Sequence, residues 1–265
     1  MKQINLIGGP FQHAYSSVWW KKPKEIEWLK NQYISDISFY VDNDIKIGVN
    51  DNKPQRKFAW LNESRQFHNM TDWIIYNKEK IEQNYELLFT HDDNISKLSE
   101  KFIFIPGNGF WIETPKVYNK TKLLSMITSV KNQTIGHKKR HQIMSKFASK
   151  MDLFGRGIKD IKLKEEGLSD YMFSFAIEND NYDTYFSEKI LDCFATGTIP
   201  IYWGTKNISK YFDSNGIIFY DDKFDISMLS KEFYLSKLES IKYNYEKVLE
   251  IEIPEDYIFK NFINI

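Results

Sequence analysis

The chain of 265 residues is 42% hydrophobic and 16% aromatic, and its 36 basic side chains balance 36 acidic ones. Such a chain is long enough for two domains of ordinary size with substantial cores. The resulting net charge of zero gives no electrostatic reason to expect a nucleic acid or an anionic membrane as a partner. A lone cysteine, Cys193, excludes an intramolecular disulfide and fits a reducing compartment.

No stretch approaches the ~20 consecutive apolar residues that a membrane span needs. The chain goes directly into the short apolar segment INLI, residues 4–7, and no secretion signal precedes it. A cytoplasmic protein without a membrane span is therefore expected.

The first half of the chain predicts an α/β domain. Apolar runs of strand length, bounded by turn residues, predict strands at Gln3–Ile7, Ile37–Val41, Lys57–Leu61, Trp73–Tyr76, Leu87–Thr90 and Phe102–Ile105. Helices are expected at Lys24–Asn31, around Met70 and at Ile81–Tyr85.

The second half alternates strands and helices more regularly. Strands are expected at Leu123–Thr128, Met151–Phe154, Tyr171–Ile177, Ile199–Tyr202 and Ile217–Tyr220. Helices are expected at Lys138–Lys150, Glu188–Thr196 and Leu229–Leu249. This alternation is typical of a parallel, doubly wound sheet.

Residues 171–204 are the most informative part of the chain. Tyr171–Ile177 is an apolar run of strand length, and the polar residues 178–181 follow it directly. Ligands of open α/β sheets bind at the carboxyl ends of the strands, which is where these polar side chains are expected. The segment therefore predicts a ligand site.

The helix expected at Glu188–Thr196 begins at this site. Ser187 before it is a favourable N-cap, and Gly197 after it stands where a helix end takes a residue with positive φ. The first turn carries Glu188 and Lys189. The carboxylate can accept from two vicinal hydroxyls, and the cation lies where unpaired backbone N–H groups already favour phosphate. Recognition of a sugar nucleotide needs this combination.

These residues resemble the donor motif of the fucosyltransferases of glycosyltransferase family 10. That motif reads roughly F-x-x-x-x-E-N, a spacer, Y-x-x-E-K, an apolar helix and G-T-x-P-x-x-x-G, and it appears here as FSFAIEN, YFSEK and GTIPIYWG. The spacing from Asn179 to Glu188 agrees as well. Further stretches match in order, among them KFAWLNESRQF, KKRHQIMSKFA and GIIFYDDKF, so the resemblance spans about residues 55–250.

The resemblance implies an α/β protein of GT-B type, with two Rossmann-like domains facing each other across a cleft. Residues 1–118 would bind the acceptor, residues 119–250 would bind the nucleotide-sugar donor, and the tail 251–265 would pack on the first domain. The implied reaction is inverting: a hydroxyl of a glycan acceptor attacks the anomeric carbon of a GDP-sugar. GDP-fucose is the favoured donor, although a related nucleotide-linked sugar would use the same site.

The resemblance also implies which charged residues act in the reaction. Glu63, in an E-S context, would be the general base that takes the proton from the acceptor hydroxyl. Arg140 and Lys189 would stabilise the departing diphosphate, the arginine as a fork and the lysine as a point charge. These two cations can substitute for a metal. No cofactor is therefore required, and a divalent metal would at most stimulate.

The remaining donor-binding residues follow from the same motif. Glu188 would accept from the ribose hydroxyls, Tyr185 would pack on or hydrogen-bond to the nucleotide, and Asn179 would orient the donor phosphate or sugar. Arg156 and Glu178 are two further candidates for donor binding.

Each of these residues also has a structural interpretation. Glu63 could be a solvated loop acid paired with Arg65. Arg140 could belong to a solvated helix start formed by residues 138–141, and Arg156 could serve a turn. The two charges at the start of the donor helix could be ordinary first-turn charges.

Other chemically distinctive residues favour structural roles. Cys193 falls on the apolar face of the donor helix and is expected to be buried and inert. Three histidines lack metal-ligand spacing: His13, His68 and His91. An aromatic cluster could form an acceptor platform or part of the core: Tyr15, Trp19 and Trp20.

A competing enzyme hypothesis comes from the sequence Asp42-Asn43-Asp44, which fits the D-x-D pattern of metal-dependent glycosyltransferases. The same residues are the commonest turn formers after a strand. A third hypothesis is an inactive module that binds a carbohydrate or nucleotide and transfers nothing.

Overall fold

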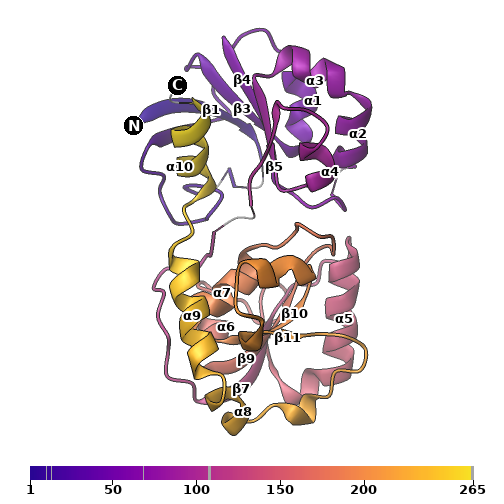
Figure 1. The fold of residues 1–265 in the computed structure, drawn as a ribbon, viewed down its shortest axis with the longest axis vertical. Helices are drawn as coiled ribbons and strands as arrows, with labels where there is room; N and C mark the ends of the chain where they lie inside the picture. The colour runs from indigo at the N-terminus through magenta and orange to yellow at the C-terminus, as the bar shows by residue number, and fades with distance from the viewer. Residues whose placement is uncertain (10, 13, 68, 107–108, 264–265) are drawn as a thin grey trace. The chain divides into compact units, whose positions relative to one another are not determined.

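The computed structural model describes residues 1–9, 11–12, 14–67, 69–106 and 109–263. The chain divides into two compact units (Figure 1). The first consists of Met1–Asn108 with Glu252–Ile265, and the second of Gly109–Ile251. The boundary expected between residues 118 and 119 lies inside the second unit.

The first unit is built on a parallel sheet with the strand order β2-β1-β3-β4-β5-β6. Its strands are β1 (Lys2–Gly8), β2 (Ile26–Lys30), β3 (Ile37–Val41), β4 (Arg56–Leu61), β5 (Leu87–Thr90) and β6 (Phe102–Phe104). Five of them confirm strands expected from the apolar runs, because those runs are buried and bounded by turn residues.

The helix expected at Lys24–Asn31 is wrong, because β2 occupies this stretch. β2 is an edge strand that pairs in parallel with β1, with Lys2 beside Ile26 and Leu6 beside Lys30. Glutamate, lysine and leucine favour helices in isolation, but pairing with a buried strand outweighs that local preference.

The helices of the first unit are short: α1 (Ile45–Gly48), α2 (Met70–Tyr76), α3 (Lys78–Asn84) and α4 (Asp93–Ser96), with a 3-10 turn η1 (Asp42–Asp44). The strand expected at Trp73–Tyr76 is wrong, because α2 covers it. Met70 and Ile74 are buried one turn apart, while Tyr76 is exposed. Burial therefore repeats with the helical period and not with the period of two that a strand would show.

The tail of the chain belongs to the first unit. α10 (Pro254–Ile258) is followed by the π-helical turn η6 (Phe259–Ile263). Three apolar side chains of the tail enter the same core cluster as β1, β3 and β4: Ile258, Phe259 and Ile263.

Two acids in the first turn of α10 tie the tail to the loop between β1 and β2. The Glu255 carboxylate accepts from the backbone N–H of Ser17 at 2.6 Å and from its hydroxyl at 2.9 Å. Asp256 accepts from the backbone N–H of Lys24 at 2.7 Å. The tail therefore supplies both apolar contacts and hydrogen bonds to the first unit.

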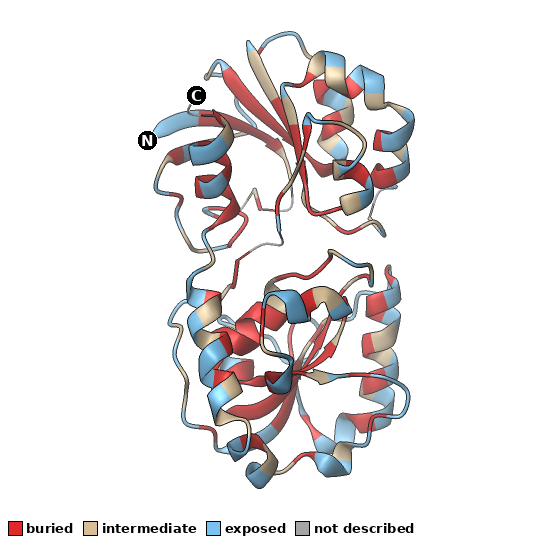
Figure 2. Cartoon of the chain, in the orientation of Figure 1, coloured by how far each residue is buried: buried red, intermediate tan, exposed pale blue. Residues whose placement is uncertain are grey.

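The second unit contains a parallel sheet with the order β11-β10-β9-β7-β8. Its strands are β7 (Lys122–Ile127), β8 (Asp152–Phe154), β9 (Tyr171–Ile177), β10 (Ile199–Trp203) and β11 (Ile218–Phe219). β9 lies at the centre, and all its residues are buried (Figure 2). A central strand covered on both faces reads as one continuous apolar run, which is why its bounds could be predicted.

The helices of the second unit are α5 (Ile135–Phe147), α6 (Glu165–Leu168), α7 (Glu188–Thr196), α8 (Lys231–Leu235) and α9 (Leu238–Leu249), with 3-10 turns η2 (Ala148–Lys150), η3 (Lys206–Lys210), η4 (Ser214–Gly216) and η5 (Ile226–Met228). The single helix expected at Leu229–Leu249 is wrong, because residues 236–237 separate α8 from α9. Within the described ranges, no helix is long and apolar enough to cross a membrane.

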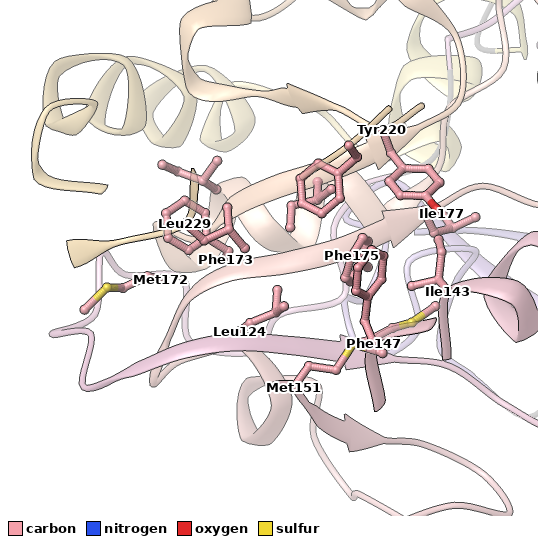
Figure 3. Packing of buried hydrophobic residues seen from close by; sticks show 14 of the residues in the cluster. Leu124, Ile143, Phe147, Met151, Met172, Phe173, Phe175, Ile177, Tyr220 and Leu229 are labelled. Atoms are coloured by element: carbon pink, nitrogen blue, oxygen red, sulfur yellow. The ribbon is translucent and has the colours of Figure 1, made fainter. Parts of the chain in front are cut away.

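The core of the second unit has two clusters that meet at β9. Phe173, Phe175 and Ile177 belong to a cluster that also takes Ile143 and Phe147 from α5 (Figure 3). Ala176 belongs to the other cluster, together with the apolar residues of α7. Since alternate residues of a strand face opposite sides of a sheet, α5 and α7 pack on opposite faces of β9.

Candidate functional site

The start of α5 lies directly against the carboxyl end of β9. The Gly136 N–H donates to the Asn179 carbonyl at 3.1 Å. A Cβ on Gly136 would come within 1.7 Å of the Glu178 carbonyl oxygen, so only glycine allows this approach. The first turn of α5 and the polar residues after β9 therefore form one structure.

Arg140 joins α5 to the same strand end. Its Nε and Nη2 donate to the Ile177 carbonyl at 3.0 and 2.6 Å, and Nη2 also donates to Asn179 Oδ1 at 2.8 Å. α5 begins at Ile135, earlier than expected, so Arg140 lies in its second turn. Only 7% of Arg140 is exposed, so the solvated helix start is the wrong interpretation for this residue.

The surroundings of Arg140 have opposing effects on its positive charge. Burial lowers the pKa of Arg140, and nearby Glu178, Tyr185 and Glu188 oppose that shift. Burial and the Arg140 charge lower the pKa of His137 to about 4, so this neighbour stays neutral. Among the described residues, Nη1 of Arg140 makes no hydrogen bond, whereas Nε and Nη2 do.

Glu178 is fully buried at the end of β9 and binds the start of α7. Its carboxylate accepts from the Ser187 N–H at 2.9 Å and from the Ser187 hydroxyl at 2.6 Å. Burial raises the pKa of Glu178, and the Lys189 ammonium 3.6 Å away acts against that rise. Glu178 therefore holds the loop and the lysine in place.

The start of α7 differs in one detail from the prediction. Ser187 occupies the N-cap position, but its hydroxyl makes no capping bond to the helix backbone because it donates to Glu178. The helix itself runs over Glu188–Thr196 as predicted, and Gly197 has φ of 69° at its end. The Lys189 Nζ donates to the Ser187 hydroxyl oxygen at 3.0 Å and to Glu188 Oε1 at 3.2 Å.

Glu188 accepts from two lysines. Besides Lys189, Lys164 donates to the same Oε1 at 3.3 Å. Burial opposes ionisation of Glu188, but the two ammonium groups outweigh it and lower the pKa of the carboxyl below its usual range. The interpretation of Glu188 and Lys189 as ordinary solvated first-turn charges does not fit this network, in which their side chains are only 13% and 22% exposed.

Tyr185 lies in the loop between β9 and α7. It is buried and stacks on Tyr182, with ring centroids 5.1 Å apart and an angle of 24° between the planes. The Asp183 carbonyl in the same loop accepts from the Thr205 hydroxyl at 2.7 Å and from Asn207 Nδ2 at 3.0 Å. The donor loop is therefore tied to the loop that follows β10.

Four candidate donor-binding residues are thus connected with Glu178 around the end of β9: Arg140, Asn179, Glu188 and Lys189. Arg156 is not brought to this cluster. It is exposed in the turn after β8, and it forms no hydrogen bond or ion pair with any other residue described in the structure. The turn interpretation therefore fits Arg156 better.

Glu63 belongs to the first unit and follows β4 in the chain. Its side chain is half-buried, and its backbone N–H donates to Asp42 Oδ1 at 2.9 Å. The Asn62 N–H donates to the same oxygen at 2.8 Å. Arg65, considered as a partner of Glu63, forms an ion pair with Asp92 with an N–O distance of 2.5 Å.

Asp42 uses one carboxylate oxygen to hold the Glu63 loop, and it lies buried with a backbone φ of 52°. Its other oxygen, Oδ2, has no hydrogen-bond partner among the described residues. Burial and the nearby Glu63 charge raise the pKa of Asp42 to about 7. Within the described residues, no group of three or more His, Cys, Asp or Glu side chains could hold a metal ion.

The remaining candidates divide between core and surface. Cys193 is buried as predicted, and burial raises the pKa of its thiol, which makes a thiolate unfavourable. Tyr15 and Trp19 are 57% and 39% exposed, so the core interpretation is wrong for them. His91 is buried beside the Asn62 carbonyl at 3.0 Å. Two of the histidines lie outside the described residues: His13 and His68.

Two functional candidates were missed by sequence reasoning. Lys164 donates to Asp192 Oδ2 at 2.5 Å as well as to Glu188. Asp192 had a recognisable signal, because it is an acid on the apolar run of α7, one turn after Glu188. Lys164 had none, because it stands in the lysine-rich stretch KLKEEG.

Solved structures share this architecture. The crystal structure of an alpha1,3-fucosyltransferase superposes with a TM-score of 0.52, covers 94% of this chain and 81% of its own, and is 16% identical. TarM gives 0.55 over 87% of this chain and 55% of its own at 12% identity. HepE from Anabaena, in complex with UDP, gives 0.55 over 94% of both chains at 8% identity. At such identities the likeness shows the fold alone, which is the GT-B fold with two Rossmann-like units.

The sequence comparison identifies a family, which the shared fold alone does not. The profile "Glycosyltransferase family 10 (fucosyltransferase) C-term" matches residues 117–252. The chain therefore belongs to glycosyltransferase family 10, and both the predicted family and the predicted fold class are confirmed.

Two curated relatives show how much of the chain is shared. Alpha-(1,3)-fucosyltransferase FucT of Helicobacter pylori is 31% identical over 105 residues, which are 38% of this chain and 22% of that protein. Human 4-galactosyl-N-acetylglucosaminide 3-alpha-L-fucosyltransferase 9 is 25% identical over 213 residues, which are 76% of this chain and 56% of that protein. The matches thus cover between about a fifth and just over half of the relatives' length.

Proposed function

We propose that the chain is an inverting glycosyltransferase that moves fucose from GDP-fucose to a hydroxyl of a glycan acceptor. The observation that carries this proposal is the connected group of Arg140, Asn179, Glu178, Glu188 and Lys189 at the carboxyl end of β9. Membership of glycosyltransferase family 10 supports the reaction class, and relatives named as fucosyltransferases support the sugar.

The diphosphate of the donor would bind between the starts of α5 and α7. Arg140 presents Nη1 there while its other nitrogens hold β9, and Lys189 brings an ammonium group that is held by Ser187 and Glu188. Backbone N–H groups in the first turn of each helix add partial positive charge. As the bond to the sugar breaks, the diphosphate gains negative charge, and these groups stabilise it. The reaction then requires no metal cofactor.

The nucleoside would be recognised by the neighbouring residues. Glu188, kept ionised by its two lysines, accepts from the ribose hydroxyls. Tyr185, with its stacked partner Tyr182, offers an aromatic surface to the nucleotide. Asn179, whose Oδ1 is held by Arg140, orients the donor phosphate or sugar.

Glu63 would act as the general base. The acceptor oxygen forms a bond to the anomeric carbon, its proton passes to the Glu63 carboxylate, and the bond from carbon to the diphosphate oxygen breaks with its electron pair. Asp42 supports this role because it holds the Glu63 backbone N–H. The exposed rings of Tyr15 and Trp19 are candidate platforms for the sugar faces of a glycan.

Calorimetric titration with GDP, GDP-fucose and UDP, each with and without EDTA, tests the proposal without knowledge of the acceptor. Tight GDP binding that survives EDTA, with weak UDP binding, is expected. Preference for UDP or strict metal dependence would contradict it. An acceptor screen with GDP-fucose follows, and binding without any transfer across the screen would favour the inactive binding module.

A further inference from the structure

Lys164 lies outside every predicted site and yet is connected to the centre of the donor cluster. It stands just before α6, and its Nζ lies 3.3 Å from Glu188 Oε1 and 2.5 Å from Asp192 Oδ2. The two acids are one turn apart on α7 and are both largely buried, with side chains 13% and 1% exposed. One ammonium group therefore bridges two carboxylates on the same helix face.

The two carboxylates would repel each other without this cation. Like charges four residues apart on a helix are unfavourable, and burial strengthens the repulsion. The Asp192 and Glu188 charges outweigh burial and raise the pKa of Lys164, so the ammonium group stays charged. Lys164 therefore acts together with Lys189 to keep Glu188 ionised next to Asp192.

Trp111, from a third segment of the chain, contacts both Asp192 and Lys164. Its backbone N–H donates to Asp192 Oδ1 at 2.5 Å, and its ring lies 4.4 Å from the Lys164 ammonium group. The lysine is thus held between an indole face and two carboxylates, and its side chain is only 21% exposed. A cation fixed in this way restricts the position of the Glu188 carboxylate.

We propose that Lys164 is a positioning residue that sets the Glu188 carboxylate for the ribose hydroxyls of the donor nucleotide. The inference rests on the proposed function, in which Glu188 accepts from those hydroxyls. Lys189 donates to the same Glu188 oxygen, and the proposed function also assigns it to the diphosphate. Lys164 has no assigned role at the diphosphate, so its loss should change recognition of the sugar hydroxyls more than recognition of the diphosphate.

The test compares GDP with 2′,3′-dideoxy-GDP, which keeps the base and the diphosphate but lacks both ribose hydroxyls. Wild type should bind GDP about 10- to 100-fold more tightly than the dideoxy nucleotide, as expected for hydrogen bonds to a charged acceptor. In Lys164→Met this ratio should fall to about threefold or less, and Lys164→Arg should restore most of it. Lys162→Met, the same substitution at an exposed residue, should retain the wild-type ratio.

The ratio separates positioning from a merely structural role. Damage to α7 as a whole would weaken both nucleotides alike and leave the ratio unchanged, which would overturn the inference. If wild type binds GDP but does not discriminate between the two nucleotides, the ribose role of Glu188 fails and the inference fails with it, while the donor class stands. If wild type does not bind GDP, the proposed function itself fails.

A second variant allows the test to be made even if Lys164→Met does not fold. Lys164→Met leaves Asp192 buried without its cation, and removal of one partner of a buried pair is strongly destabilising. The double variant Lys164→Met/Asp192→Asn removes the leftover charge and keeps an acceptor for the Trp111 N–H. Its thermal melt shows whether it is folded, and a reduced ratio in this variant supports the inference while a wild-type ratio overturns it.

Discussion

Two buried carboxylates have the same structural role in the two units: Asp42 in the first and Glu178 in the second. Each follows a strand, and each accepts at least one backbone N–H from a segment that carries or adjoins a candidate functional residue. Asp42 binds the N–H groups of Asn62 and Glu63, and Glu178 binds that of Ser187. In both units a side chain after one strand thus holds a second part of the chain.

The electrostatic conditions of these two carboxylates differ. Glu178 has the Lys189 ammonium 3.6 Å away and the Ser187 hydroxyl as a second donor. Asp42 faces the charges of Glu63 and Asp44, and burial together with these charges raises its pKa to about 7. Burial raises the pKa of both carboxyls, but a lysine acts against the rise in the second unit, whereas only backbone hydrogen bonds do so in the first.

The largest effect is expected from Glu63, whose backbone N–H donates to Asp42. Glu63→Gln should lower kcat by about 100- to 10,000-fold, because the acceptor hydroxyl loses its base, and the Kd for GDP should stay unchanged. Transfer assays and calorimetry measure the two quantities. Glu79→Gln, an exposed acid of the same unit, should behave as wild type. Unchanged turnover in Glu63→Gln would exclude it as the base.

Lys189, which lies 3.6 Å from Glu178, should instead affect binding of the donor nucleotide. Lys189→Met should weaken GDP binding about 100-fold or more, because a charge-assisted contact to phosphate is lost. Calorimetry measures the Kd, after a thermal melt has shown that the variant is folded. Lys231→Met on α8 is exposed and serves as the control. Equal affinity of wild type and Lys189→Met would remove the lysine from the diphosphate site.

Stability should distinguish the two carboxylates directly. Glu178→Gln should lower the free energy of unfolding by about 2–4 kcal/mol at pH 7.5, because Ser187 and Lys189 lose charge-assisted bonds inside the protein. Asp42→Asn should cost about 1 kcal/mol or less at that pH, because it replaces a carboxylate without a cation. Urea unfolding measures both, with the exposed Glu246→Gln as control. Similar losses in the two variants would contradict the difference in compensation.

The last expected effect is a pH dependence of the stability that belongs to Asp42. Its pKa is about 7 in the folded protein against a usual 3.8, so between these values the folded state binds more protons than the unfolded state. Stability from this group is therefore present at low pH and is lost as the pH rises through 7. From pH 5 to pH 7.5, wild type should lose about 1–3 kcal/mol more than Asp42→Asn. Parallel curves for the two proteins would show that Asp42 does not titrate in this range.

Much of the fold of the second unit could be predicted because its signals are local. β9 is a buried central strand and reads as one apolar run, and α7 lies between an N-cap residue and a glycine with positive φ. The first unit was harder. β2 is an edge strand made of helix-favouring residues, and only its pairing with β1 decides its structure.

The residues of the candidate site could likewise be predicted where the signal was local, and not where it depended on distant parts of the chain. Glu188 and Lys189 were found because they stand together at the start of a helix. The bond between Glu178 and Ser187 joins residues across a polar loop whose path no local pattern sets. Lys164 was missed because its partners lie on another element and its own surroundings in the chain are a run of charges.

The first unit is made from two separated stretches of chain, whereas the second is continuous. During translation the strands of the first unit leave the ribosome early, but the residues of α10 that bind its loop and enter its core are made only after the whole of the second unit. Domains generally fold in the order in which they are synthesised. Here the later unit can be complete while the earlier one still lacks part of its core, so a nascent chain without the tail should expose apolar surface that chaperones recognise.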